Sequence, residues 1–272
     1  MSKKSQISRS DHSSTEMPGR AITTTRYRSY VFYGRSGTGK TTIAGSFPKP
    51  ALLLDFKDEG TDSVIATEDL QCRSLSSLEE WETMYWWLKA NHKKFETVII
   101  DTVSQIQQIA MVELLGETRN GKPIGQWGSM TQRDFGTVSA FLSEWLMNYR
   151  DLAAEGLMNV VFIAQDRTFN GDNENAQENE IDPEVGPALF PSVAKRLNAS
   201  VSVIGNTFIR MKYKETEGAK GKKKVKEEPE YCLRIGPSSA YTTKIRKDKS
   251  IVVPSFISDP TYEDILDIIK GE

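Results

Sequence analysis

Short apolar runs alternate with amphipathic stretches along most of this chain. The first apolar runs, rich in β-branched and aromatic residues, lie at residues 29–33, 51–56, 97–101 and 159–165. The stretches around them have helical spacing and predict helices that begin at residue 40 or cover residues 78–91, 104–115, 138–152 and 188–197. Strands that alternate with helices form parallel sheets covered on both faces. The pattern therefore predicts an α/β fold with a mostly parallel sheet flanked by helices.

Three further apolar runs, at residues 199–205, 207–213 and 231–236, extend this pattern toward the C-terminus. The last two flank a lysine-rich segment and predict an antiparallel hairpin at one edge of the sheet. The tip of this hairpin is either solvated or a mobile basic flap over nucleic acid. The serine-rich residues 1–19 predict a disordered tail. Since no linker or repeat divides the rest, we expect one domain over residues 20–272.

Composition narrows the classes of partner. The 272 residues include 35 basic and 37 acidic side chains, for a net charge of -2. No global field attracts a polyanion, so any nucleic-acid site must be local. No apolar run is long enough for a membrane span or a signal peptide, which predicts a cytoplasmic protein without a membrane partner. Cys72, Cys232, His12 and His92 lack the spacing of a metal site or a disulfide framework, and we expect both cysteines to be small core side chains.

A glycine-rich loop follows the first apolar run. It consists of Gly34, Arg35, Ser36, Gly37, Thr38, Gly39, Lys40 and Thr41, and it matches G-x-x-x-x-G-K-[ST] at every fixed position. Glycines let successive backbone N–H groups converge on phosphate oxygens, and the N-terminus of the following helix adds a positive dipole end. Lys40 supplies a mobile charge, the Thr41 hydroxyl can bind Mg²⁺, and Thr42 completes the expected contacts. The loop predicts a nucleotide site for ATP and Mg²⁺.

Asp101 ends the apolar run at residues 97–101. Its carboxylate is therefore expected at the C-terminal edge of the sheet, where open α/β sheets bind ligands. Asp101 is either the carboxylate of the Mg²⁺ site or the N-cap of the next helix. Its position some 60 residues after the phosphate loop favours the metal site.

Four segments in a fixed order resemble the RecA-like recombinase core, and more closely the RecA-like ATPases that phages encode for single-strand annealing. They are the glycine-rich loop and residues 51–60 (ALLLDFKDEG), 98–104 (VIIDTVS) and 159–167 (NVVFIAQDR), with a weaker fifth match at residues 242–256 (TTKIRKDKSIVVPSF). The resemblance spans residues 28–256. It implies a RecA-like P-loop core that hydrolyses ATP with Mg²⁺, self-assembles into a ring or filament and acts on single-stranded DNA. A single-strand binding protein is a further partner that it suggests.

The resemblance also implies roles for residues near the γ-phosphate. In that family an acidic residue after the second core strand orients the attacking water, and a glutamine after the fourth core strand senses the γ-phosphate. Asp58 and Glu59 are the candidates for the first role, although Lys57 stands where the family's D-x-E pattern has glutamate. A solvated acidic turn is the alternative. Gln165 matches the second role, and it is otherwise a polar residue that closes a strand.

In RecA-like assemblies, basic residues of a neighbouring subunit reach the γ-phosphate. Arg246, Lys247 and Lys249 match that segment. Cations there would stabilise charge that develops on the transferred phosphoryl group. A surface-exposed basic turn explains the same residues equally well.

Two long connections lie where this family carries its DNA-binding loops, at residues 116–136 and 168–187. Cations and an aromatic face suit single strands, and the first connection supplies them at Arg119, Lys122, Trp127 and Arg133. The second connection is acidic and repels a phosphate backbone. It therefore lies away from DNA, contacts DNA only through its ends, or faces a protein partner.

The sequence is also compatible with two other functions. Another P-loop enzyme, such as a nucleotide kinase, would need an arginine-rich lid and an acceptor pocket that the sequence does not display. A nucleotide-dependent switch or loader with little turnover is favoured by the acidic second connection and by Lys57.

Overall fold

The computed structural model describes residues 26–56, 60–116, 118–119, 122–123, 131–168, 185–217 and 223–272. The expected tail at residues 1–19 lies outside these ranges. The strands are β1 (Ser29–Tyr33), β2 (Ala51–Asp55), β3 (Leu70–Ser74), β4 (Thr97–Asp101), β5 (Thr118–Arg119), β6 (Lys122–Pro123), β7 (Asn159–Ala164), β8 (Asp166–Thr168), β9 (Val185–Pro187), β10 (Val203–Glu217), β11 (Lys223–Arg234), β12 (Lys244–Ile245) and β13 (Phe256–Ser258). The α-helices are α1 (Lys40–Gly45), α2 (Leu78–Ala90), α3 (Val103–Gly116), α4 (Gln132–Ala154), α5 (Pro191–Ser200) and α6 (Tyr262–Lys270), and η1 (Gly60–Val64) and η2 (His92–Lys94) are 3-10 helices.

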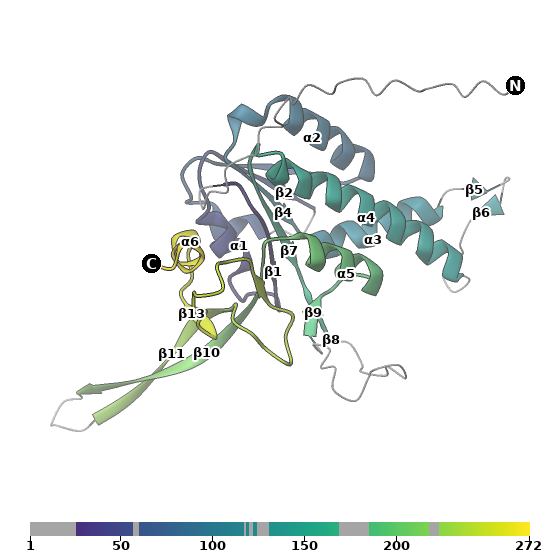
Figure 1. The fold of residues 1–272 in the computed structure, drawn as a ribbon. Helices are drawn as coiled ribbons and strands as arrows, with labels where there is room; N and C mark the ends of the chain where they lie inside the picture. The colour runs from purple at the N-terminus through teal and green to yellow at the C-terminus, as the bar shows by residue number, and fades with distance from the viewer. Residues whose placement is uncertain are drawn as a thin grey trace, which may run out of the picture.

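A mixed sheet forms the centre of the molecule. Its strand order is β13-β11-β10-β1-β7-β4-β2-β3, and β12 also pairs with β10. Six neighbouring strands run parallel to one another, in the order β10, β1, β7, β4, β2 and β3. The remaining strands of this sheet, β11, β12 and β13, form antiparallel pairs. β10 and β11 continue away from the body of the protein as a long hairpin (Figure 1). The predicted α/β fold, with a mostly parallel sheet and a C-terminal antiparallel hairpin, is confirmed.

Side chains of the central strands point alternately into two cores. Val31 and Tyr33 of β1 belong to the core under α2, α3, α4 and α5. Tyr30 and Phe32 belong to the core under α1 and α6. Both faces of the sheet are therefore covered, as Figure 1 shows, and this explains why the central strands read as continuous apolar runs rather than as alternating ones.

The prediction of separate strands at residues 199–205 and 207–213 is wrong. α5 continues to Ser200, and a single strand, β10, runs from Val203 to Glu217. Asn206 and Thr207 interrupt the apolar pattern, but both are buried, and their side chains donate hydrogen bonds of 3.3 Å to the carbonyl oxygen of Tyr33. These polar residues therefore attach β10 to the end of β1 instead of breaking the strand.

The apolar pattern also missed β3 and α6. β3 is an edge strand whose residues Gln71, Cys72 and Arg73 are exposed, so it contains no apolar run. The expectation that both cysteines lie in the core is accordingly wrong for Cys72, whereas Cys232 is buried in β11.

The helices of the described residues are too short or too polar to span a bilayer.

Candidate nucleotide-binding site

The glycine-rich loop connects the C-terminal end of β1 to the start of α1. Gly37 and Gly39 have φ angles of 76° and 87°, which lie in the left-handed region that glycine adopts without strain. Position 34 requires glycine for a different reason, which is steric. A Cβ there would collide with the carbonyl oxygen and the hydroxyl of Thr207 on β10. The loop can therefore turn tightly against the neighbouring strand only because these positions are glycine.

Thr38 holds the loop to this strand. Its hydroxyl lies 2.6 Å from the Thr207 hydroxyl and donates a 2.8 Å hydrogen bond to the carbonyl oxygen of Arg35. Both threonines are buried. Because β10 also pairs in register with β1, both the loop and the strand that precedes it are held to β10.

Lys40 is buried under the loop, with 6 % of its surface exposed. Its ammonium group donates hydrogen bonds to the carbonyl oxygens of Gly34 at 2.8 Å and Arg35 at 2.7 Å. A cation is therefore held inside the turn of the loop, where it closes the loop on itself. The same ammonium could exchange these carbonyl oxygens for phosphate oxygens.

Thr41, in the first turn of α1, and Asp101, at the end of β4, meet at the C-terminal edge of the sheet. The Thr41 hydroxyl donates a 2.7 Å hydrogen bond to Oδ2 of Asp101, which is 3 % exposed at the end of β4. Hydroxyl and carboxylate oxygens are suitable ligands for Mg²⁺. This ion keeps several waters and is bound through one or two carboxylates and substrate phosphates. The described residues contain no cluster of three or more His, Cys, Asp or Glu that could enclose a metal. This donor pair thus fits a Mg²⁺ ion that arrives with a nucleotide.

One cavity of about 380 Å³ collects these groups. It is lined by Lys40, Thr41 and Asp101 together with Gln165, which directly follows β7. The backbone N–H of Gln165 donates to the Ser104 hydroxyl at 3.0 Å, and its carbonyl oxygen accepts from the N–H of Ala188 at 2.7 Å. The sheet therefore brings residues that lie more than a hundred positions apart to one edge.

Tyr33, the last residue of β1, braces the same edge. Burial raises the pKa of its phenol well above the ordinary value, so the hydroxyl stays protonated and acts as a donor. It donates to the carbonyl oxygens of Val185 at 3.2 Å and Thr242 at 3.0 Å. This ties the strand before the loop to β9 and to the segment that leads into β12.

The other predicted site residues lie elsewhere or outside the described ranges. Asp58, Glu59 and Trp127 lie outside them. Arg119 and Lys122 belong to the short pair β5 and β6, whose side chains are not described, and Arg133 is exposed in the first turn of α4. Arg246, Lys247 and Lys249 follow β12, which pairs with the N-terminal end of β10 and thus lies at the other end of the strands from the loop. Ser36, Gly37 and Gly39 of the loop also line the cavity, as does Thr42 of α1.

The sequence patterns missed four residues of this edge. Asp62 and Ser63 of η1 line the cavity, as does Tyr231 of β11. Asp62 belongs to the same acidic segment as Asp58 and Glu59, and this composition is a signal that could have identified it. Nothing local pointed to Tyr231 or Thr207, because only the pairing of β10 with its neighbours brings them to the loop.

Comparison with known proteins agrees with this geometry. A search of curated proteins finds no match to the chain. A family model described as an AAA domain matches residues 26–247, a range that runs from the segment before β1 to the segment after β12 and includes the entire cavity. The chain belongs to this AAA domain family and is a P-loop ATPase of the AAA type.

Proposed function

We propose that this protein binds ATP with Mg²⁺ at the glycine-rich loop, hydrolyses it and acts on single-stranded DNA in recombination or annealing, assembled as a ring or filament. The observation that carries the nucleotide part is the 2.7 Å hydrogen bond between Thr41 and Asp101 beside the buried Lys40. These are the three side chains that a P-loop site needs for a triphosphate and its metal.

The roles follow from position. The loop amides and Lys40 would bind the phosphates, and Thr41 with Asp101 would hold Mg²⁺, which neutralises charge on the phosphate oxygens. Hydrolysis also needs a group that orients water. Asp62 is exposed on η1 and lines the cavity, so it joins Asp58 and Glu59 as a candidate for that role.

Coupling to DNA would run through Gln165. Its amide can interact with a phosphate oxygen without adding charge. Its backbone is hydrogen-bonded to Ala188, and the next residues form β8, which pairs with β9. A shift of Gln165 would therefore move both ends of the connection between these strands. The DNA contacts that we propose are Arg119, Lys122, Trp127 and Arg133, a set of cations and one aromatic ring suited to single strands.

Assembly would place a neighbour's cations at the nucleotide. Lys249 is exposed, and Lys247 donates only to the carbonyl oxygen of the adjacent Asp248 among its described contacts. These two lysines are better placed to reach another subunit than Arg246, whose guanidinium is hydrogen-bonded to the end of α5. A nucleotide-dependent switch or loader for a replication partner is the alternative function, because Lys57 occupies the position of a catalytic glutamate.

The test measures ATP turnover with and without single-stranded DNA, together with electron microscopy of the same samples. We expect turnover that DNA stimulates, formation of rings or filaments, and loss of turnover in Lys40→Ala. Lys89→Ala is the matched control, since Lys89 is a partly exposed lysine on α2, away from the cavity, that pairs with Glu155 at 3.0 Å. Turnover that DNA leaves unchanged would contradict the DNA role, and saturable ATP binding without turnover would support the switch.

A further inference from the structure

A second polar cavity lies at the opposite edge of the sheet, where the parallel strands begin. Its volume is about 130 Å³. Four arginines line it, Arg26 and Arg28 before β1, Arg150 on α4 and Arg246 after β12, together with the serines Ser200 and Ser202. We call it the arginine cavity. Nothing in the nucleotide site accounts for this gathering of cations.

Arg28 is the buried member of the cluster, with 4 % of its surface exposed. Its Nη1 donates to the carbonyl oxygen of Arg26 at 3.1 Å, but its Nε has no hydrogen-bond partner within the described part of the chain. The same is true of the buried Nε of Arg150. Buried donors without an acceptor are costly, and both of these donors belong to arginines that line the same polar cavity, which points to an acceptor bound there.

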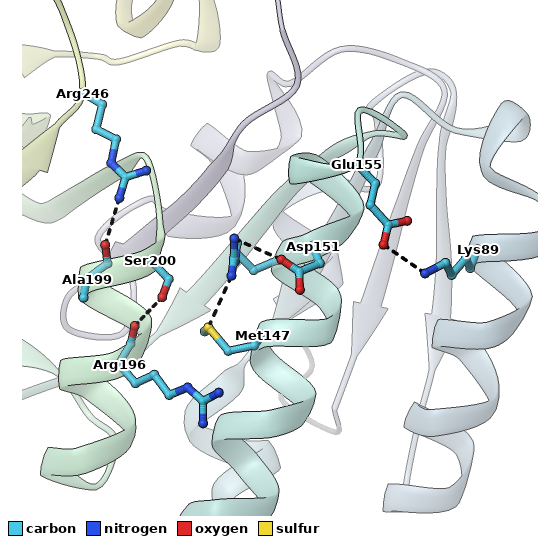
Figure 2. Close-up of polar contacts among 9 residues, drawn as sticks. Lys89, Met147, Asp151, Glu155, Arg196, Ala199, Ser200 and Arg246 are labelled. Carbon is cyan, nitrogen blue, oxygen red and sulfur yellow. Dashed lines mark hydrogen bonds and ion pairs between the residues drawn. The ribbon is translucent and has the colours of Figure 1, made fainter. Parts of the chain in front are cut away.

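The protein's own negative groups balance this charge only in part. Arg150 pairs with Asp151 at 3.0 Å, and Arg246 donates to the carbonyl oxygen of Ala199 at 2.9 Å, near the C-terminal end of α5 (Figure 2). The C-terminal ends of α4 and α5 each contribute roughly half a negative charge. The described residues that line the cavity include four arginines and no carboxylate, and Glu96 lies in the adjoining cavity that Arg26 and Arg28 also line. Positive charge is therefore in excess among the residues that line the arginine cavity.

Lys244 on β12 is a further partly buried cation, and it lies near Arg246. Its ammonium group donates to the carbonyl oxygens of Asn198 and Ala199 at 2.7 and 2.8 Å. Burial and the nearby Arg246 lower the pKa of Lys244 to about 8, and burial likewise lowers the pKa of Arg28. An anion in the cavity would offset the free-energy cost of burying these positive charges, because an opposite charge favours the protonated form of both side chains.

Size limits the anion. The cavity holds the volume of about four waters at roughly 30 Å³ each, and its volume of about 130 Å³ is small beside the roughly 300–1,000 Å³ of pockets that enclose drug-sized ligands. A whole nucleotide does not fit. One compact oxyanion fits, and guanidinium groups match the geometry of phosphate oxygens.

We propose that the arginine cavity is a second anion site that binds one phosphate group, separate from the glycine-rich loop. Arg26, Arg28 and Arg150 donate to the phosphate oxygens, and the serine side chains line the same space. The phosphate is either free inorganic phosphate or a phosphodiester of a DNA backbone.

The experiment measures inorganic phosphate binding by calorimetry in the Lys40→Ala background, which removes the ammonium group of the loop. We expect Arg26→Gln and Arg150→Gln each to weaken phosphate binding by about tenfold, as the loss of one charge-assisted hydrogen bond predicts. Arg196→Gln is the matched control, because Arg196 is an exposed arginine on α5 that does not line the cavity. Circular dichroism checks that each variant is folded, and Arg26 is exposed, so its replacement should leave the fold intact.

Crystals soaked in tungstate provide a second measurement that requires no substitution. We expect an anomalous peak within contact distance of Arg28 and Arg150. A peak only at the glycine-rich loop, or phosphate affinities that are the same in Arg150→Gln, Arg26→Gln and the control, would overturn the proposal.

A single-stranded oligonucleotide then identifies the source of the phosphate. If the oligonucleotide competes with inorganic phosphate, and the cavity variants weaken its binding while Arg196→Gln does not, the site binds a backbone phosphodiester. If inorganic phosphate binds without such competition, the site is specific for the free ion. Both results require the arginine cavity to bind phosphate.

Discussion

The two ends of the parallel strands carry cationic sites of different construction. At the C-terminal ends, consecutive residues form the site: glycines, Lys40 and Thr41, completed by Asp101 from β4. At the N-terminal ends, arginines gather from three separate parts of the chain around a cavity of about 130 Å³. The first site keeps its lysine inside its own turn, whereas two buried guanidinium nitrogens of the second have no acceptor among the described residues.

The difference reflects how each site binds an anion. Main-chain amides of a fixed loop can converge on several phosphates and leave room for a metal, so this end is suited to chemistry. Side-chain guanidinium groups around a small cavity can hold one phosphate, and the described carboxylate beside them, Asp151, is engaged in an ion pair with Arg150. We therefore assign turnover to the first end and binding alone to the second.

The largest effect is expected for Asp101→Asn at the C-terminal end. The amide keeps the size of the carboxylate but removes the charge that would bind Mg²⁺, so turnover should fall on the order of a hundredfold. Stopped-flow and steady-state ATPase assays over a range of Mg²⁺ concentrations measure this. Asp151→Asn at the other end is the control and should leave turnover unchanged. Equal losses in the two variants would remove the distinction between the two ends.

A smaller effect, on stability, is expected for Gly34→Ala. The new Cβ would collide with the Thr207 carbonyl and push β10 away from the loop, at a cost of about 1–3 kcal/mol in the free energy of unfolding. Gly136→Ala on α4 is the control, since a Cβ there meets nothing within 4 Å. Urea denaturation of both variants measures the difference. A Gly34→Ala variant as stable as the control would show that β10 does not constrain the loop.

The smallest effect is expected for Lys244→Met near the arginine cavity. The pKa of Lys244 is lowered to about 8, below the ordinary 10.5, so between these values the unfolded chain binds more protons than the folded one. The free energy of unfolding of the unmodified protein should therefore rise, relative to the variant, as the pH increases from 8 to 10. Because the side chain is partly exposed, the change is on the order of 1 kcal/mol or less. Thermal or urea unfolding at several pH values measures it, and a constant difference would contradict the lowered pKa.

Much of the fold followed from periodicity. The apolar runs of β1, β2, β4 and β7 were predicted because these strands are buried on both faces, which leaves a plain signal in the sequence. The edge strand β3 was missed because exposed polar side chains replace that signal. The sequence pattern divides β10 into two strands because Asn206 and Thr207 interrupt the apolar run. The pattern alone cannot show the hydrogen bonds that these two residues make to β1.

The residues of the candidate site likewise fall into those that the sequence predicted and those that it missed. The glycine-rich loop and Asp101 could be predicted because each lies at the end of a recognisable strand, and strands in a parallel sheet end at one edge. Gln165 was implied by the family resemblance, and the structure places it at the same cavity. Thr207 and Tyr231 reach that edge through the hairpin strands, whose pairing the local sequence does not encode. Asp62 reaches it through η1, which packs against α1.

The sequence by itself determined a phosphate-binding loop after a buried strand, because the loop's chemistry depends on neighbouring residues and on the missing side chains of its glycines. Only the tertiary structure decided which residues surround that loop and that four arginines share a cavity at the opposite edge. The physical reason is range: main-chain geometry acts over a few residues, whereas burial and charge act between residues that lie near one another only once the sheet has formed.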